Sequence, residues 1–293
     1  MGAEVFLAAG LAAAGAGCLA RSRYERDCLV TEEYRIVSEK IHGPEKTFVF
    51  LTDLHSKEFG EGNHRLLQAV KDAEPDAVLC GGDGMIAKYG RADLRVPLEL
   101  LTSLAREFPV YCGNGNHECR LRWEKDIYGD AGEEYETALK KAGIVCLSDS
   151  FVDLDRDIRL YGLDLPKTAY LPRGGKIPDG MIAQALGETD LMRFNLLLAH
   201  SPLFFEEYAE WGADLSLSGH FHGGTIRLPY LGGVMTPQYQ FFYPRCAGSF
   251  VLPGKFGEES RMIVGRGLGT HSINIRLNDK PQVAVIKICD PKN

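Results

Sequence analysis

The sequence contains no CxxC pair and no regular cysteine spacing, although it has eight cysteines. Several of them end apolar runs, as in DAVLC and FPVYC, where buried strands are expected. Buried cysteines behave as small apolar residues, and free thiols persist in reducing compartments. The cysteine pattern therefore favours free thiols over a disulfide framework.

An excess of positive charge is also missing. The chain has 33 Lys and Arg residues against 40 Asp and Glu residues, which gives a formal net charge of -7. The sequence has no basic patch interleaved with aromatic residues. Such a chain offers no broad attraction for polyanions, so no specific nucleic-acid partner is expected. An anionic substrate would have to be held locally.

No long apolar run occurs apart from one at the N-terminus. Residues 5–20 form an uncharged Ala, Gly and Leu run, shorter than the ~20 residues of a comfortable membrane span, and Arg21, Arg23 and Arg26 follow it. A tilted anchor, a signal segment, an interfacial helix and a buried helix of the domain all fit this run. If it is an anchor, the positive-inside rule places the rest of the chain in the cytoplasm, with export as the alternative.

The sequence shows no internal repeat and no second shift in composition. We therefore divide the chain into three parts. These are residues 1–28, a hydrophobic anchor or signal-like segment with a basic flank; residues 29–44, a linker and first strand; and residues 45–290, the main domain. A domain of this length with 45% hydrophobic residues can bury a substantial core.

Short apolar runs alternate with amphipathic stretches in the first half of the main domain, and strands dominate the second half. Strands are predicted within residues 33–39, 47–55, 76–83, 109–112, 144–154, 158–165, 195–202, 213–224, 261–269 and 282–288. Helices are predicted within residues 64–75, 96–109 and 133–143. This order predicts an α/β fold whose sheets are covered by helices.

Five predicted strands run into short loops that hold Asp, His or Asn. These loops contain Asp53 and His55 in TDLH, Asp83 in GGDG, Asn116 and His117 in GNHE, His200 in LAHSP, and His220 and His222 in SGHFHGG. One zinc ion needs four ligands, so this number of ligand-type residues suits two metal ions. Oxygen and imidazole ligands without thiolate favour Mn, Fe or Zn.

The spacing within these loops adds two expectations. In an extended segment, alternate residues point to the same side, so both members of Asp-x-His and of His-x-His are expected to face the metals. Two neighbouring cations repel each other unless an anion lies between them, and Asp83 is the natural bridging carboxylate.

The motif order D-x-H, G-D, G-N-H-E, H and G-H-x-H is complete from Asp53 to His222. The chain thereby resembles the calcineurin-like metallophosphoesterases over residues 45–288. It is most similar to the membrane-associated bacterial branch related to the YkuE and YaeI phosphodiesterases, because GGTIRLPYLGG and GRGLGTHSINIRLNDKP look like that branch. The resemblance implies an αββα four-layer sandwich, two mixed β-sheets flanked by helices, with a dinuclear centre at the loop ends.

The resemblance also implies a role for each site residue. One metal would be held by Asp53, His55 and His222, the other by Asn116, His200 and His220, and Asp83 would bridge them. Solvent between the metals would attack phosphorus in line. His117 would protonate the leaving oxygen or donate a hydrogen bond to the transition state.

One position departs from the family pattern. Many relatives carry an Asp three residues after the bridging Asp to orient the catalytic histidine, and here the residue is Ile86. The acid role of His117 is less secure for that reason. A tyrosine at this place binds ferric iron in purple acid phosphatases, so Ile86 also argues against that branch.

These observations predict a dinuclear-metal hydrolase of phosphoric esters, with a diester as the favoured substrate. If the N-terminus is in a membrane, the substrate is expected to be lipid-linked. A binding scaffold that keeps the fold without activity, and a nuclease, are the alternatives. Four arginines of the C-terminal part are expected to be ordinary surface residues: Arg227, Arg245, Arg266 and Arg276.

Overall fold

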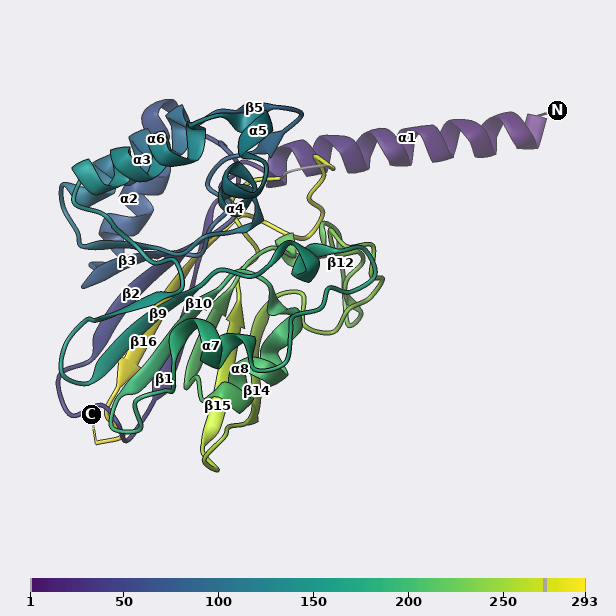
Figure 1. The fold of residues 1–293 in the computed structure, drawn as a ribbon. Helices are drawn as coiled ribbons and strands as arrows, with labels where there is room; N and C mark the ends of the chain where they lie inside the picture. The colour runs from purple at the N-terminus through teal and green to yellow at the C-terminus, as the bar shows by residue number, and fades with distance from the viewer. Residues whose placement is uncertain (1, 271–272, 293) are drawn as a thin grey trace.

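A computed structural model describes residues 2–270 and 273–292, which form two six-stranded sheets stacked face to face (Figure 1). The first sheet has the order β1-β16-β2-β3-β6-β7. Its strands are β1 (Val30–Val37), β2 (Lys46–Leu51), β3 (Ala77–Cys80), β6 (Val110–Cys112), β7 (Val145–Cys146) and β16 (Gln282–Cys289). All neighbours in this sheet are parallel except β16 and β2.

The second sheet has the order β14-β15-β11-β10-β9-β8. Its strands are β8 (Ser150–Asp153), β9 (Ile158–Leu163), β10 (Phe194–Ala199), β11 (Leu215–Ser218), β14 (Gly248–Pro253) and β15 (Glu259–Val264). The four central strands are parallel, and the edge strands β8 and β14 run antiparallel to them. Both sheets are therefore mixed, as predicted.

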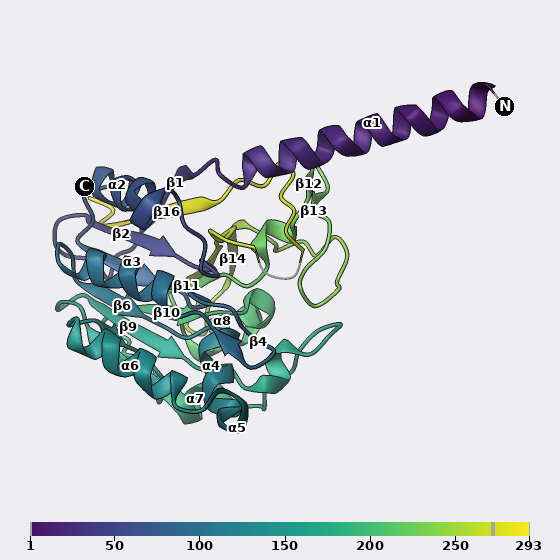
Figure 2. The same cartoon turned by 90° about the horizontal axis from the view of Figure 1, so that it is seen from above.

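Helices cover the outer face of each sheet (Figures 1 and 2). On the first sheet lie α2 (His64–Asp72), α3 (Arg95–Ala105) and α6 (Ala131–Lys141), and on the second lie α7 (Met181–Leu186) and α8 (Phe205–Trp211). The core between the sheets includes Phe48, Phe50 and Leu79 from one side and Leu196 and Leu217 from the other. The predicted αββα sandwich is confirmed.

The remaining elements are short and lie mostly at one end of the sandwich. They are α4 (Asn116–Trp123), α5 (Lys125–Tyr128), β4 (Ala87–Lys88), β5 (Arg91–Ala92), β12 (Arg227–Leu228), β13 (Gly232–Gly233), and the 3-10 turns η1 (Glu61–Asn63), η2 (Lys167–Tyr170), η3 (Pro202–Phe204) and η4 (His222–Gly224). The sequence pattern predicted none of them, nor α7, α8 and β14, because short elements with one buried turn carry little periodicity.

One segment predicted as a single strand forms two strands in the structure. Residues 144–154 were expected to be a single strand, but the structure divides them into β7 in the first sheet and β8 in the second. The bend falls at Leu147–Asp149, where the Asp149 backbone is left-handed with φ 44°. This segment therefore carries the chain from one sheet to the other.

The parallel strands of both sheets end at the same edge of the sandwich. The loops after β2, β3 and β6 of the first sheet meet the loops after β10 and β11 of the second, and all five loops hold ligand-type residues. Ligand sites of α/β sheets form beyond the carboxyl ends of such strands. The topology thus brings residues from 53 to 222 into one place.

The N-terminal helix α1 (Gly2–Glu25) projects away from the domain (Figures 1 and 2). Its residues Glu4–Glu25 are long and apolar enough to cross a membrane, since the helix continues past the apolar run through the first basic residues. The same length and composition also fit a signal sequence. All eight cysteines of the chain are free, in agreement with the expectation from their spacing.

The last turns of α1 are held by the domain. Ser22 and Glu25 are buried, and the Ser22 hydroxyl accepts a 3.0 Å hydrogen bond from the backbone amide of Arg276. The amide of Asp279 donates to Glu25 Oε2 at 3.4 Å. The end of α1 is therefore part of the domain, whereas its N-terminal turns are exposed.

Two truncations test this division of α1. Deleting residues 1–20 removes the exposed turns and keeps Ser22 and Glu25, so the melting temperature is expected to stay unchanged. Deleting residues 1–28 leaves two buried amides without their acceptors, at about 1–3 kcal/mol each, and we expect the melting temperature to fall by several degrees. Thermal unfolding of both proteins without detergent measures the difference, and equal values would show that the contacts of Ser22 and Glu25 contribute nothing.

Candidate metal centre

Eight side chains from five loops converge at the carboxyl edge of the two sheets. Three groups of them place their ligand atoms within 4.8 Å of one another: Asp53, His55 and His222; Asp83, His200 and His220; and His55, Asp83 and His117. All of these residues are buried. The structure therefore brings together every residue that the sequence suggested for the site, with Asn116 beside them.

Ring nitrogens and carboxylate oxygens point at the same small volume. His55 Nε2 lies 3.1 Å from His222 Nε2 and 3.9 Å from Asp53 Oδ1. His200 Nε2 lies 3.2 Å from Asp83 Oδ2 and 3.7 Å from Asp53 Oδ1. Asp83 Oδ2 is also 3.8 Å from His55 Nε2, so Asp83 is shared by both sides of the cluster.

Backbone carbonyls fix the orientation of three of these rings. The Nδ1 atom of His200 lies 2.7 Å from the carbonyl of Gly81, that of His222 lies 3.2 Å from Gly269, and that of His55 lies 3.4 Å from Met85. A carbonyl only accepts, so each Nδ1 carries a proton and each Nε2 is the ring atom turned toward the site. Metal-binding histidines are held in this tautomer by the same kind of outer contact.

The buried carboxylates make the site attractive to positive charge. Burial raises the pKa of Asp53 to about 6. Burial acts in the same direction on Asp83, but the charge of His200 outweighs it and holds the pKa of Asp83 well below its usual value. Burial lowers the pKa of His200, yet Asp83 and Asp53 overcome this and raise it to about 10. Two carboxylates out of contact with water thus favour cations between them.

Asn116 adds an oxygen without another partner. Its Oδ1 atom is buried and accepts no hydrogen bond from the residues that the structure describes. A buried amide oxygen left unpaired costs free energy. An oxygen of this kind at the rim of a His and Asp cluster fits a divalent cation as its partner.

The ligand loops are bent, not extended. Asp53, His55, Asp83, His220 and His222 all have left-handed backbones, with φ between 47° and 65°. The prediction that Asp-x-His and His-x-His are extended segments is therefore wrong, and left-handed turns bring their side chains together instead. Non-glycine residues adopt this conformation at a cost and are enriched at functional sites.

Two glycines are required by space. A Cβ atom on Gly115 would lie 2.2 Å from Asp83 Oδ1, and one on Gly219 would lie 2.3 Å from Asp53 Oδ2. These distances are far below van der Waals contact, so any side chain at either position would displace a carboxylate. The glycines in GNHE and SGHFHGG thus make room for the acidic residues of other loops.

His117 has the opposite tautomer from the other rings. Its Nδ1 lies 2.8 Å from the backbone amide of Ala87 and 3.2 Å from the Ala87 carbonyl, to which Arg120 Nη1 also donates at 2.7 Å. The amide contact is the shorter one, and an amide only donates, so Nδ1 acts as the acceptor. The proton therefore lies on Nε2, which faces Asp83 Oδ2 at 4.0 Å. Burial lowers the pKa of His117, so the neutral ring presents an N–H donor to the site.

This contact also accounts for the missing aspartate at position 86. Strand β4 places the main chain of Ala87 against His117, while Ile86 itself is only half-buried. A backbone amide therefore orients the histidine in this chain. Sequence reasoning had no means to find it, because a main-chain donor has no residue signature.

Glu118 is a residue of the site that sequence reasoning did not single out. Its carboxylate accepts hydrogen bonds from the amides of Asp83 at 2.8 Å, Gly84 at 2.8 Å and Gly115 at 2.9 Å. Burial raises the pKa of Glu118 to about 7. Its contact with Gly115 caps the first turn of α4, a pattern that the E of GNHE could have suggested.

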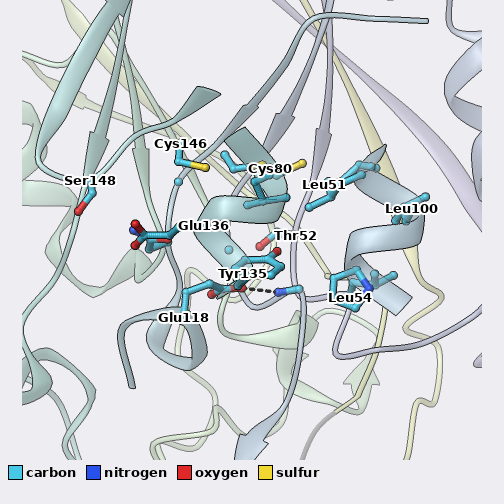
Figure 3. Close-up of a pocket in the computed structure, with 18 of the residues that line it drawn as sticks. Leu51, Thr52, Leu54, Cys80, Leu100, Glu118, Tyr135, Glu136, Cys146 and Ser148 are labelled. Carbon is cyan, nitrogen blue, oxygen red and sulfur yellow. Dashed lines mark hydrogen bonds between the residues drawn. The ribbon is translucent and has the colours of Figure 1, made fainter. Parts of the chain in front are cut away.

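Glu118 also separates the metal centre from a second cavity of about 180 Å³ (Figure 3). Leu51, Cys80, Leu100 and Tyr135 line this cavity, and Figure 3 shows the Glu118 carboxylate at its edge with one of its hydrogen bonds. The carboxylate therefore ties together the loops after β3 and β6 from behind the site.

Arg276 is not the surface residue that was expected. Its side chain is buried, and its Nη2 atom donates to the carbonyls of Gly269 at 2.7 Å and Gly267 at 3.2 Å. The Gly269 carbonyl is also the partner of His222 Nδ1. Arg276 thus fixes the loop that orients His222, and its own amide bonds to the end of α1.

Comparison with known proteins agrees with this geometry. The family model of calcineurin-like phosphoesterases matches residues 46–224. The chain is 27% identical to "Uncharacterized metallophosphoesterase YkuE" of Bacillus subtilis, over 96% of this chain and 93% of that protein. It is 28% identical to "Phosphodiesterase YaeI" of Escherichia coli, over 82% of this chain and 81% of that protein.

A solved structure of Haemophilus influenzae NAD nucleotidase (NadN) is also similar, at 19% identity and a TM-score of 0.44, over 77% of this chain and 46% of that one. The chain spans less than half of NadN. This distant likeness carries no argument about function.

Glu118→Gln tests the support behind the metal centre. The amide keeps one acceptor oxygen but turns an NH2 group toward backbone N–H donors, so we expect about 2–3 kcal/mol less stability to urea and a lower metal content. The matched control is Glu136→Gln, a residue at the rim of the same cavity whose side chain is 39% exposed. Equal urea midpoints for the two variants would contradict the role of Glu118.

Proposed function

The chain belongs to the calcineurin-like phosphoesterase family, whose members are metal-dependent phosphoester hydrolases, and we propose that it hydrolyses phosphodiesters at a dinuclear metal centre. Similarity to a phosphodiesterase over most of both chains supports the preference for a diester. The observation that carries the proposal is Asp83, a buried carboxylate shared between two groups of histidine and aspartate ligands.

The ligand assignment follows from which atoms lie together. One metal ion would be held by Asp53, His55 and His222, a second by Asn116, His200 and His220, and Asp83 would hold both. The Nε2 atoms of His200 and His222 that converge on Asp53 and Asp83 support this assignment. Oxygen and imidazole donors suit Mn, Fe or Zn.

Two divalent cations, when bound, supply neutralisation of the phosphoryl oxygens and activation of solvent for in-line attack on phosphorus. The chain's own residues orient the histidine rings and hold the loop of Asp83 in place. The carbonyls of Gly81, Met85 and Gly269 keep the three imidazoles turned inward, and Glu118 keeps the Asp83 loop against α4. A scaffold that had lost activity would not need all seven ligand positions in place.

His117 is the proposed donor to the leaving group. Its Nε2–H faces the site, and a neutral imidazole donates a hydrogen bond to an oxygen on which charge develops. His117 also belongs to the third group of ligand atoms, with His55 and Asp83. The tautomer imposed by the Ala87 amide favours the donor role, because Nε2 then has no free lone pair.

The proposed location is a membrane surface, with the domain on the cytoplasmic side. Arg21, Arg23 and Arg26 follow the apolar part of α1, and eight free thiols suit a reducing compartment. A signal-like role of α1 would place the domain outside instead. Protease protection in spheroplasts distinguishes the two.

Asp83→Asn tests the shared ligand. We expect hydrolysis of bis-p-nitrophenyl phosphate to fall by about a hundredfold or more, because neither ion keeps its full ligand set. Elemental analysis should show a loss of divalent metal at both sites. Asp179→Asn, on the exposed surface before α7, is the control. Unchanged hydrolysis by the Asp83 variant would rule out the bridging role.

His117→Ala tests the donor. Turnover is expected to fall by about 10²-fold on diesters with poor leaving groups and less on p-nitrophenyl esters, since only poor leaving groups need the donor. Metal content should stay near that of the original chain, and His64→Ala, at the start of α2, serves as the control. Loss of metal from the His117 variant would show that this ring is a ligand.

A further inference from the structure

A loop beside the metal centre exposes several large apolar side chains. The loop covers residues 228–242, between η4 and β14, and is called the aromatic loop here. Its exposed residues are Leu228, Tyr230, Leu231, Tyr239, Phe241 and Phe242. Tyr230 is fully exposed and Phe241 is 66% exposed. Large apolar side chains exposed together on one short loop are a candidate interaction site.

The base of the aromatic loop is firmly attached to the domain. Gln238 is buried, and its Nε2 donates to the carbonyls of Ala169 at 3.1 Å and Leu171 at 3.0 Å. The amide of Arg173 donates to the Gln238 carbonyl at 2.8 Å. The loop is thus held in place while its apolar side chains point outward.

The same loop forms a wall of the cavity that contains the metal ligands. This cavity has a volume of about 210 Å³, and its lining includes His55, Asp83, His117 and His222 of the metal centre. Its lining also includes the apolar residues Met235, Pro237, Tyr239, Ile273 and Ile275. The cavity is therefore shared by the candidate metal ligands and by apolar side chains, some of them from the aromatic loop.

The aromatic loop lies on the side of the domain from which α1 projects (Figures 1 and 2). Figure 2 shows β12 and β13 beside α1. Backbone contacts connect the two: Arg227 donates to the Leu277 carbonyl at 2.9 Å, and the neighbouring Arg276 amide bonds to Ser22. These contacts hold the end of α1 in a defined position relative to the aromatic loop.

Among the described residues, no other element covers the apolar part of α1. Phe6 is 81% exposed and Leu11 67%. The exposed turns, residues 4–20, are about 26 Å long at 1.5 Å per residue, which approaches the ~30 Å of a hydrocarbon core. If α1 crosses a bilayer, its docked end holds the aromatic loop at the same membrane face. Tyr and Phe side chains and arginines such as Arg21 are the residues that favour this interface.

We infer that the aromatic loop is a membrane-contact surface, and that the adjoining cavity takes a phosphoester whose long apolar chain remains in the bilayer. The part of the inference that concerns the phosphoester substrate rests on the proposed phosphodiesterase function. The occupant of the apolar surface is a lipid bilayer, because the exposed loop lies on the side of the domain from which the exposed α1 projects.

Membrane contact is tested in the full chain, reconstituted in vesicles of phosphatidylcholine and phosphatidylglycerol. Tyr230→Trp places a fluorophore on the loop, and phosphatidylcholine brominated on its acyl chains should quench the added emission. Met192→Trp is the control, since Met192 is 82% exposed just before β10, at the opposite end of the sheet from the metal centre. The unsubstituted chain gives the background of its two tryptophans.

Equal quenching of the two variants would overturn the inference. So would shielding of the introduced tryptophan by a second copy of the chain, detected as loop-to-loop cross-linking without quenching. Preferential quenching at position 230 supports it.

Substrate access is tested with two phosphodiesters that share a leaving group. Phe241→Asp should lower hydrolysis of hexadecyl p-nitrophenyl phosphate in vesicles by about tenfold. A negative charge in place of an apolar ring opposes contact of the loop with the bilayer. Hydrolysis of soluble bis-p-nitrophenyl phosphate should stay the same, since Phe241 lies outside the lining of the cavity.

Equal losses on both substrates would contradict the inference, because the loop would then act on the site itself. If the unsubstituted chain hydrolyses neither substrate, the proposed function fails, and the quenching result still decides whether the loop contacts the bilayer.

Discussion

Two aspartates buried at one edge of two facing sheets are the constraint around which the site is organised. Asp53 and Asp83 are removed from water, and both lie within 4 Å of His200 Nε2. Unpaired buried charge is costly, so the fold must supply compensating positive charge there. The inward-facing imidazoles and the free oxygen of Asn116 make cations the natural solution. Cations bound there would stabilise the fold at the place where they would also act on a substrate.

Support for these aspartates comes from the backbone and from residues behind them. Left-handed turns aim the ligands, Gly115 and Gly219 leave room for the carboxylates, and Glu118 gathers three amides of the loops around Asp83. Arg276 continues this support to the end of α1 through Ser22. A helix suited to a membrane and His222, a proposed metal ligand, thus share one supporting loop.

The site also shows how a changed residue can be compensated. Family members with an aspartate at the position of Ile86 use a side chain to orient the histidine. Here the Ala87 amide in β4 does so and fixes the proton on Nε2. A backbone donor cannot ionise, so it sets the tautomer without adding another negative charge to a site that already holds the buried carboxyl groups of Asp53, Asp83 and Glu118.

The sequence by itself determined the α/β class, most of the long strands and helices, and the five loops that hold Asp53 to His222, because apolar periodicity and ligand-type residues at strand ends are local signals. It did not predict the left-handed turns, the division of residues 144–154 between sheets, or the roles of Glu118 and Arg276. Only the tertiary structure decided these, since each depends on contacts between segments far apart in the chain. The placement of the aromatic loop beside α1 has the same origin. It depends on the contact between residues 22 and 276, which lie far apart in the chain and meet only in the folded domain.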